Sequence, residues 1–361
     1  MEKKLVIGLA PTRRDTRDFE LHFAHERKAA VEKRIRSIAE RLGASVVTVD
    51  FLNDEGLMIF PSDAEKAAKY FIQQDVDAVI VPHVNFGAEE AVALLGRLVG
   101  KPFLLWGPRD ETPPPTGARQ TDTQCGLFAS GMVLDRYNVP FTYLENCWLD
   151  SEKLDEGVEH FLRVASVVKA FSRLRIGQIS VRPRTFLTVE VNECELTERF
   201  GAQIVTIDYT EMMMEIQRIL DEGDARAEEI HEGLKRDYDV SKMEPEQVKK
   251  IAAMEAAFLN FSEKYGITCF ASECWRTFSV PFGIMPCAGF ADLIQRGLPV
   301  ACECDIHGAI SSTLLAAAAL WQKPTFLADM TIRHPTNNNA ELLWHCGPCP
   351  SSMAMPGVKP R

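Results

Sequence analysis

Three side chains near the end of this sequence could bind one metal ion together. Two are carboxylates and the third is an imidazole, and all three are common metal ligands in proteins. They are Glu303, Asp329 and His345, which lie in the segments 301–308, 326–329 and 344–347. The order and the types of these residues predict a metal centre in the last sixty residues of the chain.

Both carboxylates follow short apolar runs that we interpret as strands, 297–302 before Glu303 and 323–327 before Asp329. Parallel α/β sheets form their sites at the carboxyl ends of strands, so this placement favours a functional pair. Asp305 could share a strand face with Glu303, but the turn toward Gly308 favours a helix-capping role for it.

Strand-like and helix-like segments alternate along the whole chain. In the first half, the predicted strands are 5–10, 45–51, 78–82 and 103–106, and helical patterns at 26–42 and 64–74 lie between them. A second opening strand begins at Arg175. This alternation predicts an α/β protein with two consecutive Rossmann-like or flavodoxin-like parallel-sheet domains, at residues 1–172 and 173–345.

Composition narrows the class of protein. The chain has 361 residues, a net charge of −11 and 46% hydrophobic residues. Its basic residues are dispersed, which argues against a nucleic-acid surface, and its apolar runs are too short for a membrane span. The ten cysteines in a chain of this size favour free thiols in a reducing cytoplasm.

Cysteines near the two ends of the predicted site allow other interpretations. A structural zinc site is the alternative, because four thiols provide a plausible ligand set, namely Cys302, Cys304, Cys346 and Cys349, although the Cys-x-Cys spacing is tight for two ligands on one strand. The Cys-Gly-Pro-Cys sequence at 346–349 is also similar to a thioredoxin active site, but only twelve residues follow it, so we disfavour a redox role.

The same motifs resemble the L-fucose isomerase and L-arabinose isomerase superfamily. The resemblance rests on Ala-Cys-Glu-Cys-Asp-Ile-His-Gly-Ala at 301–309, Phe-Leu-Ala-Asp at 326–329, Trp-His-Cys-Gly at 344–347 and Cys-Trp at 274–275. It is closest to the shorter members described as L-fucose isomerase-like, and with the two α/β domains it covers essentially the whole chain.

The resemblance implies an aldose–ketose isomerase that uses Mn²⁺ or another divalent metal ion. Glu303 and Asp329 would be the catalytic acid–base pair and metal ligands, with His345 as a further ligand. The chemistry suits these residue types, because two carboxylates can move a proton between adjacent sugar carbons while a divalent ion stabilises the enediolate. A non-catalytic sugar-binding or regulatory protein on the same two domains is the alternative.

The family also implies features beyond these two domains. Its members continue into a third, β-rich domain of barrel type, which is absent or truncated here, and residues 346–361 would be its start. The resemblance implies a homo-oligomer, trimer or hexamer, in which a neighbouring subunit helps to form the pocket. If the first domain does this, Arg13, His83 and Asn85 are candidate contacts, although they match no family motif.

The substrate is expected to be a monosaccharide, with L-fucose, L-arabinose, D-arabinose and sulfoquinovose as candidates. Three arginines could bind an anionic group on such a sugar: Arg109, Arg182 and Arg184. The sequence alone does not rank these sugars.

Overall fold

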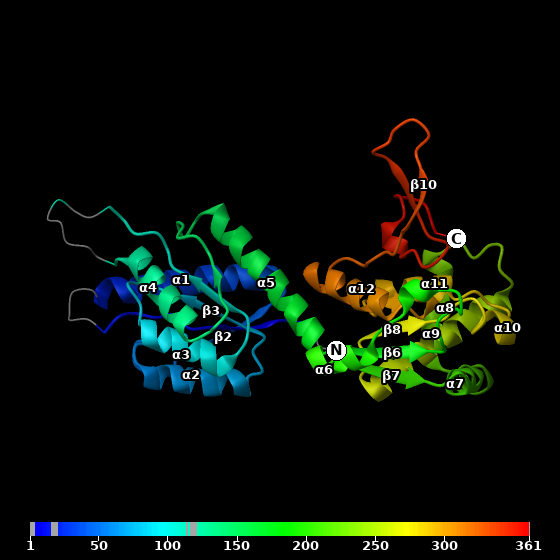
Figure 1. Ribbon diagram of the computed structural model, residues 1–361, viewed down its shortest axis with the longest axis horizontal. Coiled ribbons are helices and arrows are strands. Elements are labelled where there is room, and N and C mark those ends of the chain that lie inside the picture. The colour runs from blue at the N-terminus through cyan, green and yellow to red at the C-terminus, as the bar shows by residue number, and fades with distance from the viewer. Residues whose placement is uncertain (1–3, 16–20, 113–114, 116–120, 361) are drawn as a thin grey trace. The chain divides into compact units, whose positions relative to one another are not determined.

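The computed structural model describes residues 4–15, 21–112, 115 and 121–360. The chain divides into two compact units, an N-terminal unit that ends at Val168 and a C-terminal unit that begins at Lys169. Figure 1 shows a parallel sheet with surrounding helices in each of them. This arrangement confirms the predicted α/β class with two Rossmann-like parallel sheets.

The N-terminal unit contains one five-stranded sheet in the order β2-β1-β3-β4-β5, and all its neighbouring strands are parallel. Its elements are β1 (Val6–Leu9), α1 (Leu21–Arg41), β2 (Ser45–Thr48), α2 (Pro61–Gln73), β3 (Ala78–Pro82), α3 (Glu89–Val99), β4 (Phe103–Trp106), α4 (Thr123–Arg136), β5 (Thr142–Tyr143) and α5 (Glu152–Ser172). Each predicted strand of this half forms, because a run of apolar residues can be buried on both faces of a parallel sheet.

The C-terminal unit contains a second parallel sheet, in the order β7-β6-β8-β9. Its elements up to the last strand of that sheet are β6 (Arg175–Ile179), η1 (Leu187–Val189), α6 (Glu193–Phe200), β7 (Gln203–Ile207), α7 (Tyr209–Glu222), α8 (Ala225–Asp237), α9 (Pro245–Tyr265), β8 (Cys269–Ser272), α10 (Ser279–Phe282), α11 (Cys287–Gln295) and β9 (Val300–Ala301). The remaining elements are η2 (Cys302–Cys304), α12 (Ile306–Ala318), β10 (Asp329–Arg333), β11 (Glu341–Trp344) and η3 (Ser351–Met353).

The second sheet is buried on both faces. Phe270 of β8 packs in an apolar core with residues of α7, α8, α9 and α11. Its neighbours Cys269 and Ala271 face the other side, in a cluster with residues of α12. Because side chains alternate along a strand, a continuous apolar run serves both faces at once. The loops at the carboxyl ends of the strands are thereby held on a rigid support.

One predicted strand does not form. Residues 323–327, expected as a parallel strand before Asp329, have no strand pairing, and none of their side chains is buried. Pro324 lacks the N–H that a sheet ladder needs, and β9, the edge strand of the sheet, is only two residues long. Asp329 instead opens β10, which pairs antiparallel with β11 in a separate hairpin. The prediction that Asp329 follows a parallel strand was therefore wrong.

In the part of the chain that the structure describes, no helix has the length and apolar character needed to cross a bilayer.

Candidate functional site

Glu303 lies directly after β9, in the short helical turn η2. Its backbone is left-handed, with φ 63° and ψ 18°, and Cys304 follows with φ 58°. A non-glycine residue in this region costs about 1–3 kcal/mol, and such strain is concentrated at functional sites. The turn therefore holds the Glu303 side chain in a direction that a regular strand or helix would not give it.

The next residue of the motif, Asp305, has the capping role that the sequence favoured. Its side chain accepts a hydrogen bond from the backbone N–H of Gly308 at 2.9 Å, at the start of α12. A helix N-terminus gains stability from such an acceptor. Asp305 thus fixes the entry of α12 and separates the functional turn at Glu303 from the helix that follows.

Asp329 and His345 meet across the β10–β11 hairpin. The register places Asp329 opposite Trp344, so His345 follows immediately beyond this pair. The Nδ1–H of His345 donates a hydrogen bond to Oδ2 of Asp329 at 3.0 Å. A carboxylate on one ring nitrogen fixes the tautomer and leaves the other nitrogen as a lone-pair donor.

The second nitrogen of His345 is the atom that fits a metal ion. The His345 side chain is 3% exposed, and Nε2 is buried with no hydrogen-bond partner among the described residues. A buried, unsatisfied polar atom calls for an explanation. A divalent cation beside this ring would supply one, and the nitrogen and carboxylate donors nearby suit that role.

A cavity of about 600 Å³ in the C-terminal unit brings Glu303 and His345 together. Its wall comes from α9, from the loop after β8, from α11, from η2 and from the segment after β11. Among the lining residues are Gln247, Trp275, Glu303, His345 and four cysteines, namely Cys274, Cys287, Cys302 and Cys346. Its volume is in the range of small-molecule sites.

The electrostatics of the cavity connect the three predicted site residues. Burial raises the pKa of Glu303, and the charges of Asp329 and Asp305 raise it further, while His345 acts in the opposite direction. A carboxyl group with a raised pKa is better suited to accept and return a proton near neutral pH. His345 and Asp329 are thus close enough to Glu303 to influence its ionisation.

The three residues are not gathered into a complete metal shell. No group of three or more His, Cys, Asp or Glu side chains among the described residues has the geometry to hold a metal ion. Asp329 and His345 are in direct contact, whereas Glu303 shares the cavity with His345 only and interacts with both residues through their charges. The structure therefore supplies a nitrogen donor and a carboxylate on one cavity wall, which is a partial fit to a divalent cation.

Two thiols of this cavity were not predicted as site residues. A side-chain hydrogen bond with Cys302 lowers the pKa of Cys274, and the backbone of Glu303 acts in the same direction. The same hydrogen bond raises the pKa of Cys302. Sequence reasoning missed this pair because its members are far apart in the chain and converge only at the ends of β8 and β9.

The four thiols of the zinc alternative do not come together. Cys302 and Cys346 line the cavity, but the thiol of Cys304 points to the backbone carbonyls of Ile179, Ser180 and Ala271 at 3.7–3.9 Å. The reason is the turn at η2, which points the side chains of Cys302 and Cys304 in different directions.

In the N-terminal unit, the three candidate contact residues Arg13, His83 and Asn85 follow the carboxyl ends of β1 and β3. Arg13 is 6% exposed and forms an ion pair with Glu55, with Nε 2.6 Å from Oε2. His83 and Asn85 are buried, and the Oδ1 of Asn85 accepts from the backbone N–H groups of Arg14 and Gly87. All three are engaged in holding loops of their own unit.

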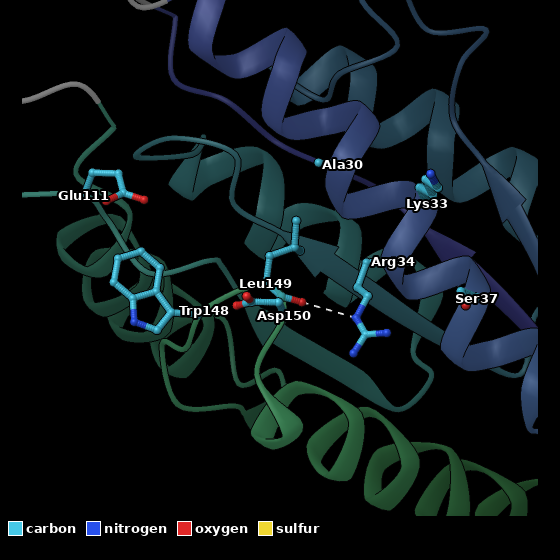
Figure 2. Close-up of a pocket in the computed structure, with 8 residues that line it drawn as sticks. All are labelled: Ala30, Lys33, Arg34, Ser37, Glu111, Trp148, Leu149 and Asp150. Atoms are coloured by element: carbon cyan, nitrogen blue, oxygen red, sulfur yellow. Dashed lines mark hydrogen bonds between the residues drawn. The ribbon is translucent and has the colours of Figure 1, made fainter.

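A larger cavity of about 1100 Å³ lies in the N-terminal unit and contains none of the predicted site residues. Figure 2 shows Arg34 donating a hydrogen bond to the carbonyl of Leu149, with Trp148 on the same loop. Arg34 is also paired with Asp155. Because this cavity combines no carboxylate–imidazole pair with a raised-pKa carboxyl group, we place the candidate site in the C-terminal unit.

Comparison with known proteins identifies related sequences. Residues 8–172 match the family described as fucose/sulfoquinovose isomerase, N-terminal domain. Sulfoquinovose isomerase of Priestia aryabhattai is 26% identical over 288 residues, which is 78% of this chain and 62% of that protein. Sulfoquinovose isomerase of Alkalicoccus urumqiensis is 26% identical over 311 residues, covering 84% and 68% of the two chains.

A solved structure of a periplasmic solute-binding protein from Actinobacillus succinogenes with bound D-allose has a TM-score of 0.21 and 11% identity, covering 89% of this chain and 94% of that one. That likeness is too low to support an inference. The sequence matches carry more weight, because the two relatives cover 78% and 84% of this chain. They support the predicted resemblance: residues 8–172 match the fucose/sulfoquinovose isomerase N-terminal domain family, and most of the chain is similar to sulfoquinovose isomerases.

Proposed function

We propose that this protein is an aldose–ketose isomerase whose reacting sugar carbons lie in the cavity of Glu303 and His345. The observation that carries the proposal is the arrangement of His345, whose Nδ1–H donates to Asp329 and whose unpaired Nε2 lines the same cavity as Glu303. The matched region spans 62% of the Priestia aryabhattai relative's length, so the activity of the whole relative is carried over here only as a proposal.

In this proposal Glu303 takes a proton from the carbon beside the sugar carbonyl and returns it to the neighbouring carbon. Its raised pKa supports the role, because a base near the working pH both accepts and releases a proton readily. Asp329 orients His345 through its hydrogen bond to Nδ1, and the hydroxyl proton of the sugar passes to the former carbonyl oxygen within the enediolate.

Glu303 and Nε2 of His345 would hold a divalent cation, with Mn²⁺ as the first choice for a mixed oxygen and nitrogen ligand set. Asp329, the third residue of the predicted set, is hydrogen-bonded to Nδ1 and would orient the ring for that cation. When bound, such an ion would polarise the carbonyl and the adjacent hydroxyl oxygen of the sugar. Sulfoquinovose is the first substrate to test, because the relatives are named sulfoquinovose isomerases. L-Fucose, L-arabinose and D-arabinose complete the panel.

The test is incorporation of solvent deuterium at the exchanging carbon of each sugar, followed by NMR with Mn²⁺ and then with chelator. We expect Mn²⁺-dependent exchange that falls by at least about 100-fold in Glu303→Gln. Glu198→Gln is the matched control, since Glu198 is an exposed residue of α6. A sugar that binds without metal, equally well in Glu303→Gln, and never exchanges would instead support a sugar-binding protein.

A further inference from the structure

A second, smaller cavity adjoins the proposed reaction site. It has a volume of about 370 Å³, and Trp275 lines both this cavity and the cavity of Glu303. Its polar lining includes Ser180, Arg182, Arg184, Tyr209, Arg276 and Thr277. None of these residues belongs to the proposed acid–base or metal-binding set.

The position of this cavity follows from the topology of the sheet. The chain runs from β6 to β7 on one side and then returns to β8 on the other side of β6. Open α/β sheets bind ligands where the strand order reverses in this way. The loops after β6 and β8 supply Arg184 and Arg276 to this cavity. Ser180, the first residue after β6, has a left-handed φ of 66°, a further point of backbone strain at the same edge.

The three arginines of the cavity differ in what they contact. Arg182 is held by an ion pair with Glu190 and by the carbonyls of Pro183 and Arg184. The guanidinium groups of Arg184 and Arg276 have no hydrogen bond or ion pair with any residue that the structure describes. Both are exposed, so their donors are available to a ligand.

The one carboxylate in the cavity wall is already saturated. Glu273 is 6% exposed and accepts from the backbone N–H groups of Trp275, Arg276 and Thr277, and from the Thr277 hydroxyl at 2.7 Å. Its charge therefore fixes the loop that carries Arg276 and does not bind that guanidinium group. With Glu190 paired to Arg182, the three arginines exceed the two carboxylates by one positive charge.

We propose that Arg184 and Arg276 form a binding subsite for an anionic group of the substrate sugar, at the end of the carbon chain away from the carbonyl. The proposal rests on the isomerase function proposed above and adds the residues that would select an aldose with a sulfonate, a phosphate or a carboxylate over a neutral one. Guanidinium groups match these oxyanions because their planar N–H donors can bind two oxygens at once. Trp275 separates this subsite from the reacting carbons.

The test compares an anionic sugar with its neutral counterpart. Sulfoquinovose and D-glucose, which differ at one end of the molecule, are titrated calorimetrically into the full chain carrying Glu303→Gln, which prevents turnover. We expect Arg184→Gln and Arg276→Gln each to weaken sulfoquinovose binding by about 10- to 100-fold, the usual effect of losing a hydrogen bond to a charged group. D-Glucose binding should be unchanged.

Two further variants make the result specific. Arg276→Lys keeps the charge but loses the paired donors, so it should recover part of the affinity. Arg199→Gln removes an exposed arginine of α6 that is paired with Glu195, and it should bind sulfoquinovose like the parent. Titration of D-glucose 6-phosphate and D-glucuronate distinguishes sulfonate from phosphate and carboxylate as the preferred anion.

The outcomes separate this proposal from the isomerase proposal. Arginine-dependent binding of sulfoquinovose without any deuterium exchange would sustain the subsite and reject the reaction. Exchange of sulfoquinovose that is indifferent to both arginines would sustain the reaction and reject the subsite. Equal affinity for sulfoquinovose and D-glucose in the parent would also overturn the subsite.

Discussion

His345 donates a hydrogen bond from Nδ1 to Oδ2 of Asp329 at 3.0 Å, and its Nε2 is buried without a partner in the described chain. The carboxylate lies on the solvent side, 58% exposed, while the imidazole is 3% exposed. The exposed carboxylate of Asp329 thus holds the His345 ring in an orientation in which Nε2 is left for the cavity. The register of the hairpin makes this contact possible, because Asp329 lies opposite Trp344, the residue directly before His345.

Asp329→Asn tests this relationship. An amide can donate its own hydrogen to Nδ1 and so favour the wrong tautomer of His345. We expect Mn²⁺ affinity, measured calorimetrically, to fall by about 10- to 100-fold, and deuterium exchange to fall with it. Asp221→Asn, at an exposed position of α7, is the control. Unchanged Mn²⁺ affinity in Asp329→Asn would argue against a role of this pair in metal binding.

Gly347→Ala tests the space around the same ring. A Cβ at position 347 would lie 2.1 Å from Nε2 of His345, so the imidazole would have to move. We expect exchange activity to fall by at least about tenfold with the thermal midpoint nearly unchanged, because this segment lies outside the apolar cores. Gly233→Ala, in α8, meets nothing closer than 3.7 Å and should leave activity intact. Full activity in Gly347→Ala would mean that His345 can be displaced without consequence.

Metal removal should abolish activity without unfolding the protein. The C-terminal core consists of apolar side chains, and no cluster of metal-binding residues holds the described part of the chain together. We expect EDTA to remove deuterium exchange while far-UV circular dichroism is unchanged, and Mn²⁺ to restore exchange. Loss of secondary structure on chelation would instead support a structural metal site, whose binding energy is folding energy.

His83 should make the N-terminal unit sensitive to acid. Burial lowers the pKa of His83 to about 4, and a hydrogen bond from its Nδ1–H to the carbonyl of Phe86 only partly opposes this. Because the unfolded chain binds a proton near pH 6.5 and the folded unit does not, stability is lost as the pH falls from about 6.5 to about 4. The expected loss is about 3 kcal/mol.

The check is an NMR titration of the His83 ring together with hydrogen exchange of β3 and β4 in the intact chain. We expect a midpoint near 4 and smaller protection factors of these strands as the pH falls below 6.5. A ring that titrates near 6.5 with unchanged protection would contradict the prediction.

Glu255 should have the opposite pH dependence in the C-terminal unit. Burial raises the pKa of this fully buried carboxyl group well above its ordinary value, and the charge of Asp292 raises it further, while Arg296 opposes the rise. A carboxyl group with a raised folded pKa gives stability that is present at low pH and lost as the pH rises above about 4.5, where the unfolded chain ionises. Glu255→Gln should remove this loss of stability at higher pH, because glutamine does not ionise.

We therefore expect the melting temperature of Glu255→Gln to exceed that of the parent by several degrees at pH 8, with the difference shrinking toward pH 4. Differential scanning calorimetry across this range measures it. Glu263→Gln, on the exposed side of the same helix, is the control. A difference that is constant with pH would indicate that Glu255 is ionised in the fold.

The sequence by itself determined the two parallel α/β units, because apolar runs of strand length between helix-length amphipathic segments can be buried in few other ways. It also placed Glu303 at a strand end, Asp305 at a helix cap and the motifs that resemble a sugar isomerase. These features depend on residues close together in the chain, where periodicity and capping chemistry act directly.

Only the tertiary structure decided how distant residues combine. It gave the segment around Glu303 a left-handed conformation and placed Asp329 in the β10–β11 hairpin beside His345 instead of after a parallel strand. It also brought the thiol of Cys274 into hydrogen-bond contact with Cys302. It also brought Arg184, from the loop after β6, and Arg276, from the loop after β8, into the wall of one cavity. The physical reason is that strand register, edge pairing and cavity walls depend on contacts between segments far apart in sequence, which no local pattern contains.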